Sequence, residues 1–218
     1  MKNLTKILSL TLIMALILTS FAFAKGYDFE IVDLSEINGP SKWAKPEIDK
    51  AKESGLLTEN TDNYFKEDIT RSQFAELVVN MVEKATGKEI SPAPTSTFID
   101  TTETIILKAY SANIVNGISK TEFAPDNYIT REQIASMLYR AIVYIENEKG
   151  KEITTKNDSI EGYTDKSSVS SWAKQGVGVL ANNNIMSGTS KTTLSPKSSA
   201  TIEQSVLLVY RLYNIVSK

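Results

Sequence analysis

The chain has 218 residues with 24 basic and 26 acidic side chains, a formal net charge of −2. This mildly acidic balance, without a basic block, argues against nucleic acid as a partner. The sequence contains no cysteine and no histidine. Disulfides, histidine-ligated metals and His-based triads are therefore excluded, and we expect no enzyme activity, no cofactor and no metal site.

Residues 1–24 are predicted to be a secretory signal peptide. Lys2 and Lys6 form a positive n-region, a long apolar run follows, and the Ala-Phe-Ala sequence at 22–24 is a small-residue cleavage site. A retained membrane anchor is the alternative interpretation. Cleavage removes two lysines and no acids, which lowers the net charge from −2 to −4. We expect a secreted chain without membrane association, because no other stretch approaches the roughly 18 consecutive apolar residues of a membrane span.

One helix-start pattern occurs three times along the sequence. Ile-Thr-Arg at 69–71 and 129–131 and Ala-Thr-Ile at 200–202 are each followed by a glutamine at the third helical position. The threonine can accept the backbone N–H at this position and the glutamine can reach back to the cap, which predicts three capping boxes. Mostly apolar residues then recur at the spacing of a core-facing helix stripe. Three copies indicate a repeat protein. The glutamines are Gln73, Gln133 and Gln204.

Each capped helix follows an aromatic-x-Asp segment, a shorter helix, a Gly or Asn stop and an extended loop. We expect the shorter helices to start at Lys42 after a Ser41 cap, at about Thr102, and after a Ser171 cap. The stops are Gly55 and its counterpart Asn113, because both types accept a left-handed conformation. The predicted boundaries are repeat 1 at 25–88, a linker at 89–97, repeat 2 at 98–146, a charged and mobile linker at 147–161, and repeat 3 at 162–218.

The order of these motifs is similar to that of a known family. Phe-Ile-Asp at 98–100, Ile-Val-Asn-Gly at 114–117, Phe-Ala-Pro at 123–125 and Ile-Thr-Arg at 129–131 resemble the pattern of the S-layer homology (SLH) domain. The resemblance covers essentially the whole mature chain as three tandem units, with no further domain expected. It implies an all-α fold with short extended segments: a pseudo-threefold unit around a central three-helix bundle, with grooves between neighbouring repeats.

The same resemblance implies a role. SLH domains attach exported proteins non-covalently to the Gram-positive cell wall, usually through a secondary cell-wall polysaccharide that often carries an acidic pyruvyl ketal. Three departures from the family pattern stand out: Ile202 replaces the motif arginine, repeat 2 lacks the Trp-Ala pair, and repeat 1 has Thr-Glu-Asn at 58–60. We therefore expect the third groove to be weak or silent.

Arg71 and Arg131 are the first candidate ligand residues. A cation at the first helical position opposes the helix dipole by roughly 0.3–1 kcal/mol, so local stability does not favour it. A helix N-terminus offers free N–H groups to an anion, and arginine adds a planar fork suited to a carboxylate. The alternative interpretation is an ion pair with a neighbouring acid, for example Asp68 or Asp126.

Trp43 and Trp172 can stack on sugar rings, or they can fill the gap between units as buried aromatics. Gly117 and Gly188 can let the backbone approach a ligand, although a turn with positive φ is the favoured interpretation.

Three aspartates complete the set of candidate site residues. Asp33, Asp100 and Asp165 can hydrogen-bond sugar hydroxyls, but fixing the turn before each shorter helix is at least as good an explanation.

Three functions compete at this point. The leading one is a cell-wall-binding module with acidic polysaccharide on the arginines. The alternative is a structural or partner-binding surface protein whose degenerate repeats bind another exported protein, since an anchor normally anchors something. A glycosidase is least favoured, because no carboxylate pair can be assigned the separation of about 5–9.5 Å that this chemistry needs.

Overall fold

The computed structural model of the chain describes residues 38–218. The expected signal peptide and Asp33 lie outside the described residues. The described helices are α3 (Lys45–Glu53), α4 (Arg71–Thr86), α5 (Thr104–Ser111), α6 (Arg131–Lys149), the 3-10 turn η1 (Lys166–Ser168), α7 (Lys174–Asn182) and α8 (Ile202–Val216). In this part of the chain the extended segments form isolated bridges and no sheet, so the all-α prediction is confirmed.

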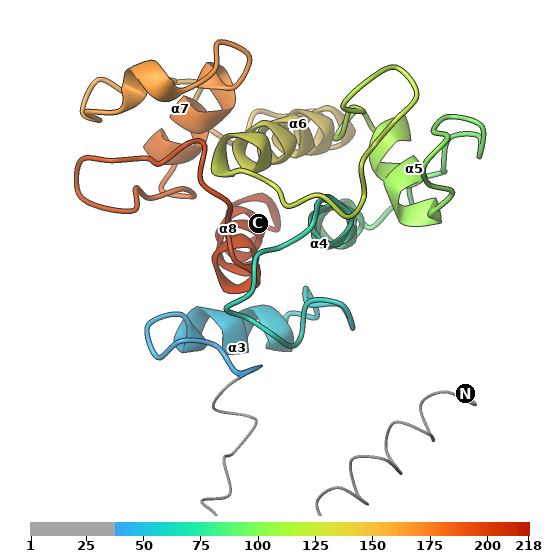
Figure 1. Ribbon diagram of the computed structural model, residues 1–218, viewed down its shortest axis with the longest axis horizontal. Coiled ribbons are helices and arrows are strands. Elements are labelled where there is room, and N and C mark those ends of the chain that lie inside the picture. Colours follow the sequence, from blue (N-terminus) through green and yellow to red (C-terminus); the bar gives the residue numbers. More distant parts are fainter. Residues whose placement is uncertain (1–37) are drawn as a thin grey trace, which may run out of the picture. The chain divides into compact units, whose positions relative to one another are not determined.

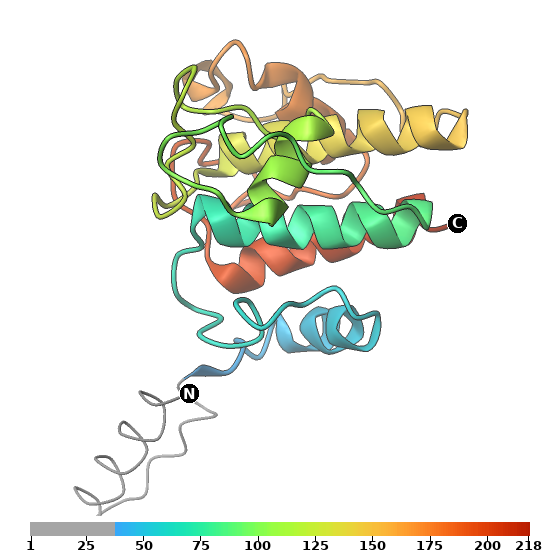
Figure 2. The same cartoon turned by 90° about the vertical axis from the view of Figure 1, so that its right-hand side faces the viewer.

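The three long helices α4, α6 and α8 pack on one another at the centre of the described fold (Figure 2). Two shorter helices pack on the long helix that precedes them in the chain: α5 on α4 and α7 on α6 (Figure 1). The first shorter helix, α3, packs on the last long helix, α8. The order of packing is therefore cyclic, which brings the two ends of the described chain together.

A ring of backbone hydrogen bonds joins the segments before the long helices. The Ile69 N–H donates to the Ala200 carbonyl at 3.0 Å, the Ala200 N–H to the Ile129 carbonyl at 3.3 Å, and the Ile129 N–H to the Ile69 carbonyl at 3.2 Å. All three residues are fully buried. The three helix starts are thus held side by side, each by both of the others.

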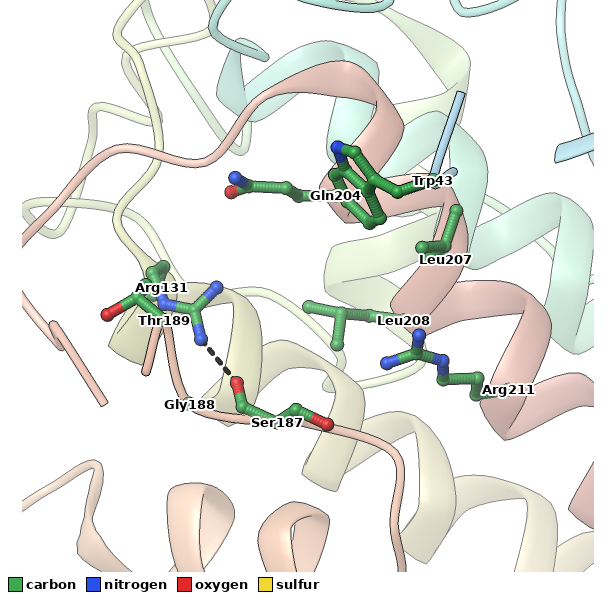
Figure 3. A pocket seen from close by; sticks show the side chains of 9 residues that line it. All are labelled: Trp43, Arg131, Ser187, Gly188, Thr189, Gln204, Leu207, Leu208 and Arg211. Carbon is green, nitrogen blue, oxygen red and sulfur yellow. Dashed lines mark hydrogen bonds between the residues drawn. The ribbon is translucent and has the colours of Figure 1, made fainter. Parts of the chain in front are cut away.

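The predicted capping boxes are confirmed at Thr70 and Thr130, where the glutamine side chain accepts from the cap N–H. At Thr201 only half of the box forms: the hydroxyl accepts from the Gln204 N–H at 3.3 Å. The reciprocal bond predicted there is wrong. The Gln204 side chain lies beside Trp43 in a groove lining (Figure 3).

The shorter helices begin later than predicted. The first helix starts at Lys45 and not at Lys42, and α7 at Lys174. Neither has a side-chain cap. The Ser41 hydroxyl, predicted to cap the first helix, instead donates to Glu203 at 2.9 Å. The left-handed stops are confirmed, with φ of 64° at Gly55 and 56° at Asn113.

The segment 147–161, predicted to be a mobile linker, is held by hydrogen bonds. Its first residues extend α6 to Lys149. Glu146 then accepts hydrogen bonds from the backbone of Ile153 at 2.9 Å and of Thr154 at 3.1 Å, and Thr154 is buried. The charged composition suggested mobility, but a buried carboxylate fixes the chain.

Candidate functional site

Two grooves of matching composition open between the packed helices. The Trp172 groove has a volume of about 520 Å³, and the Trp43 groove about 310 Å³. The Trp172 groove is lined by Arg71, Asn116, Gly117, Ile118, Gln133, Ser136, Met137, Arg140 and Trp172. The Trp43 groove is lined by Arg131, Ser187, Gly188, Thr189, Gln204, Leu207, Leu208, Arg211 and Trp43 (Figure 3).

The two linings correspond position by position. In each groove a long helix forms one wall, the loop before this helix forms the rim, the preceding long helix supplies an arginine, and a shorter helix's start supplies the tryptophan. Four different segments therefore build each groove. The predicted arginines, tryptophans and glycines all lie in these linings, whereas Asp100 and Asp165 do not.

Arg71 and Arg131 are held by backbone carbonyl groups of the rim loops. Arg71 Nε donates to the Phe123 carbonyl at 2.9 Å and Nη2 to the Asn116 carbonyl at 3.2 Å. Arg131 Nε donates to the Leu194 carbonyl at 2.8 Å and Nη2 to the Ser187 carbonyl at 2.7 Å. Both arginines are only 6% exposed. Each guanidinium group is thus fixed in orientation by hydrogen bonds from Nε and Nη2.

The alternative prediction for these arginines, an ion pair with Asp68 or Asp126, is wrong for the described residues, whose ion pairs involve neither acid. Burial lowers the pKa of both guanidinium groups, but an arginine remains charged at any physiological pH. Figure 3 shows the remaining terminal nitrogen of Arg131 pointing away from Ser187 into the groove. A fixed cation with donors to spare suits an anionic or polyhydroxyl ligand.

Asp100 and Asp165 fix the loops that receive the arginines. Asp100 accepts from the N–H groups of Phe123 at 3.0 Å and Ala124 at 2.7 Å. Asp165 accepts from the N–H groups of Leu194 at 2.9 Å and Ser195 at 2.8 Å. Burial opposes both charges, but the backbone hydrogen bonds lower the pKa of each carboxyl group below its usual value. These carboxylates therefore fix the loop before each long helix, and not the turn before each shorter helix that the sequence suggested.

Trp43 and Trp172 are exposed on the groove edges, 59% and 55% respectively. The interpretation that they plug a gap as buried aromatics is therefore wrong. An indole ring held at the edge of a groove presents an apolar face to a ligand while its N–H stays available to solvent. The exposed indole ring can therefore stack on a ring of the ligand.

Gly117 and Gly188 are required by close contacts and not by positive φ, which neither adopts. A Cβ at Gly117 would lie 2.4 Å from the Ser119 carbonyl oxygen, and one at Gly188 would lie 2.4 Å from that of Thr193. Both glycines let the rim loop fold tightly on itself. The favoured prediction of a positive-φ turn is wrong here.

Sequence reasoning missed Arg140 and Arg211, which line the two grooves at matching positions. Each lies ten residues after the capping threonine, so an alignment of the three helix starts could have found them. The residue at this place in α4 is Asn80, whose amide donates to the Gly55 and Leu56 carbonyl groups at 3.1 and 2.9 Å.

The third helix junction differs from the other two. Ile202, which replaces the motif arginine, is buried. The loop at 58–60 lies tied to α4: Gln73 donates to the Asn60 carbonyl and the Asn60 amide to Glu76, both at 3.0 Å. Side chains that would line a third groove are thus engaged with the loop.

Within residues 38–218 no helix has the length and apolarity needed to cross a membrane. The same residues contain no group of three or more acidic side chains placed to hold a metal ion.

Comparison with known proteins identifies the motif-bearing segments. The S-layer homology domain matches residues 100–135 and 162–201, which include both rim loops and the start of α6. The chain carries S-layer homology domains. Its SLH segments also align with an endoglucanase of Bacillus sp. strain KSM-635, 30% identical over 97% of this chain and 22% of that protein.

Two other similar proteins are named for the cell surface. The surface-layer 125 kDa protein of Lysinibacillus sphaericus is 26% identical over 77% of this chain and 14% of its own length. Cell surface glycoprotein 1 of Acetivibrio thermocellus is 30% identical over 46% of this chain and 5% of its own length. The chain thus spans 22% or less of these curated relatives. Together they place it among cell-surface SLH proteins. Only 22% of the endoglucanase is matched, so its activity is not carried over to this chain.

Proposed function

We propose that this chain attaches to the cell wall by binding a secondary cell-wall polysaccharide in the Trp172 and Trp43 grooves. We also infer that it is built of three tandem repeats, at 25–88, 98–146 and 162–218, of which the last two supply the rim loops. The observation that carries the proposal is the recurrence of one lining, with an exposed tryptophan and a buried, fixed arginine, in both grooves.

The chemistry of each lining suits a sugar polymer. The C–H face of a sugar ring can stack on the exposed indole ring. The amide of Gln133 or Gln204 and the free guanidinium edge can donate to hydroxyl groups or to an acidic substituent such as a pyruvyl ketal. The grooves are open at the surface, so a polymer can pass through without a free end.

The test is co-sedimentation of the mature chain with purified Gram-positive sacculi, before and after chemical removal of the secondary polysaccharide. We expect binding that is lost on stripping, and lost again in a Trp43→Ala, Trp172→Ala double variant. Tyr128→Ala is the matched control, because Tyr128 is an aromatic residue that is 61% exposed and lines neither groove. Undiminished binding to stripped sacculi would contradict the proposal.

A partner protein is the second candidate, favoured by two exposed isoleucines. Ile99 is 76% and Ile118 56% exposed. Both are hydrogen-bonded to the same loop: Ile99 N–H donates to the Thr121 carbonyl and Ile118 N–H to that of Glu122, both at 2.8 Å. Surface retention after stripping, abolished by Ile99→Ser but not by the tryptophan variant, would favour this function.

A further inference from the structure

We propose that the two grooves differ in their preference for charge: Arg140 makes the Trp172 groove prefer a sugar that carries a carboxylate, whereas Glu47 neutralises the matching arginine of the Trp43 groove and removes this preference there. This inference rests on the proposed function, since it assigns a ligand class to each of the same grooves. Arg140, Arg211 and Glu47 were not among the residues that the sequence motifs singled out.

The Trp172 groove contains two cations and no acid in its lining. Arg140 is half-buried, and among residues 38–218 it has neither an ion-pair partner nor a hydrogen bond. Arg71 donates from one edge of its guanidinium group to backbone carbonyl groups. Asp100, the acid whose charge interacts with Arg71, already accepts hydrogen bonds from backbone N–H groups. A partly desolvated guanidinium without a partner is unfavourable until an anion binds. The groove is therefore electrostatically incomplete.

The Trp43 groove has an arginine at the matching position, Arg211, but the charge of this side chain is already neutralised. Arg211 Nε and Nη2 each donate to one carboxylate oxygen of Glu47, both at 2.8 Å. This two-bond geometry is the strong form of an arginine–carboxylate pair. The hydrogen bond from Arg211 lowers the pKa of Glu47 despite its partial burial, so the carboxylate is charged at neutral pH and would repel a second one.

The difference between the grooves follows from how two short helices pack. Glu47 is the third residue of α3, and the third residue of α7 is Gly176. A Cβ at Gly176 would lie 2.8 Å from the carbonyl oxygen of Ala135 in α6. The closeness of α7 to α6 thus excludes any side chain at this position, so no acid from there can reach Arg140.

The chain holds two tryptophans in all, one in each groove, and this allows each groove to be titrated separately by fluorescence. Trp43→Phe leaves Trp172 as the reporter, and Trp172→Phe leaves Trp43. The probes are wall-polysaccharide fragments bearing pyruvyl ketals and the same fragments after mild acid hydrolysis of the ketal. Circular dichroism of each variant checks that it is folded.

Trp172 should report at least about tenfold tighter binding of the ketal-bearing fragment, the difference expected from one charge-assisted contact, and Trp43 should report no such preference. Arg140→Gln should abolish the preference at Trp172, and Glu47→Gln should create one at Trp43 by releasing Arg211. A preference that survives Arg140→Gln, or a Trp43 groove unchanged by Glu47→Gln, would overturn the inference. Binding of neither fragment to either groove would instead overturn the proposed function, and this inference with it.

Discussion

Glu132 is expected to be a main support of the Trp172 groove. Its side chain is 4% exposed and accepts hydrogen bonds from the Ser170 N–H and hydroxyl, both at 3.0 Å. It also pairs with Lys197 at 2.5 Å. Because Ser170 lies two residues before Trp172, this carboxylate fixes the chain segment that carries the indole ring.

Replacing Glu132 by alanine should destabilise the fold by about 2–3 kcal/mol. A buried donor left without its partner costs about 1–3 kcal/mol, and two donors on Ser170 lose theirs, although Ser170 is only half-buried and water can partly replace the carboxylate. The pair with Lys197 adds less than about 1 kcal/mol, because the lysine side chain is 56% exposed. For a domain of this size the melting temperature should fall by about 4–12 °C.

Urea unfolding of the mature chain measures this loss, and Glu103→Ala provides the matched control. Glu103 accepts from the Ser72 hydroxyl at 2.7 Å at the corresponding junction, but the bond is exposed, so its loss should cost less than about 1 kcal/mol. Single-tryptophan titration should also show weaker ligand binding at Trp172 in the Glu132 variant. Equal destabilisation by the two substitutions would refute the reasoning, since it would mean that burial of the carboxylate does not matter.

Two further predictions concern the packing around α7 and α6. Gly178→Ala should destabilise the fold by about 1–3 kcal/mol despite alanine's better helix propensity, because its Cβ would lie 1.9 Å from the Asp158 carbonyl oxygen. Gly162→Ala is the control: a Cβ there has no atom within 4 Å, so stability measured by thermal unfolding should change by no more than about 0.5 kcal/mol. Equal effects of the two substitutions would contradict this prediction. Burial opposes the Glu146 charge, but hydrogen bonds, the largest from Lys156, lower its pKa. Its contribution to stability is therefore present above the usual glutamate pKa and lost as pH falls through the lowered value. Glu146→Gln should lower stability at pH 7 and reduce the drop in stability on acidification, and an unchanged pH profile would disprove the linkage.

The helix starts could be predicted from sequence because their contacts are local. The threonine and glutamine of a capping box are three residues apart, so Thr70 and Thr130 satisfy their caps whatever surrounds them. Even so, the third box forms only in one half, although its residues have the same spacing. The same local pattern therefore predicts the start of the helix at all three places, but not every hydrogen bond of the cap.

The grooves themselves could be predicted only in part. The motifs indicated Arg71 and Trp172 as separate ligand candidates. That they share one groove, and whether the indole ring is buried, depends on the packing of α7 against α6, which no local pattern encodes. The role of Gly176 shows the same limit: its closest neighbour is the backbone of Ala135, 41 positions earlier in the sequence. Short-range periodicity carries no information on such an approach.

The junction at Ile202 shows that the backbone contact between neighbouring segments forms without an arginine. The Ile202 N–H donates to the Glu67 carbonyl at 2.9 Å, as the Arg71 N–H does to Asn127 at 2.9 Å and the Arg131 N–H to Ser198 at 3.0 Å. The backbone joint between neighbouring segments is thus complete without an arginine side chain. Since a buried guanidinium is unfavourable unless its hydrogen bonds are satisfied, its presence at two junctions is not explained by the joint. The proposed ligand would account for the arginine at those two junctions and would leave the third free to carry isoleucine.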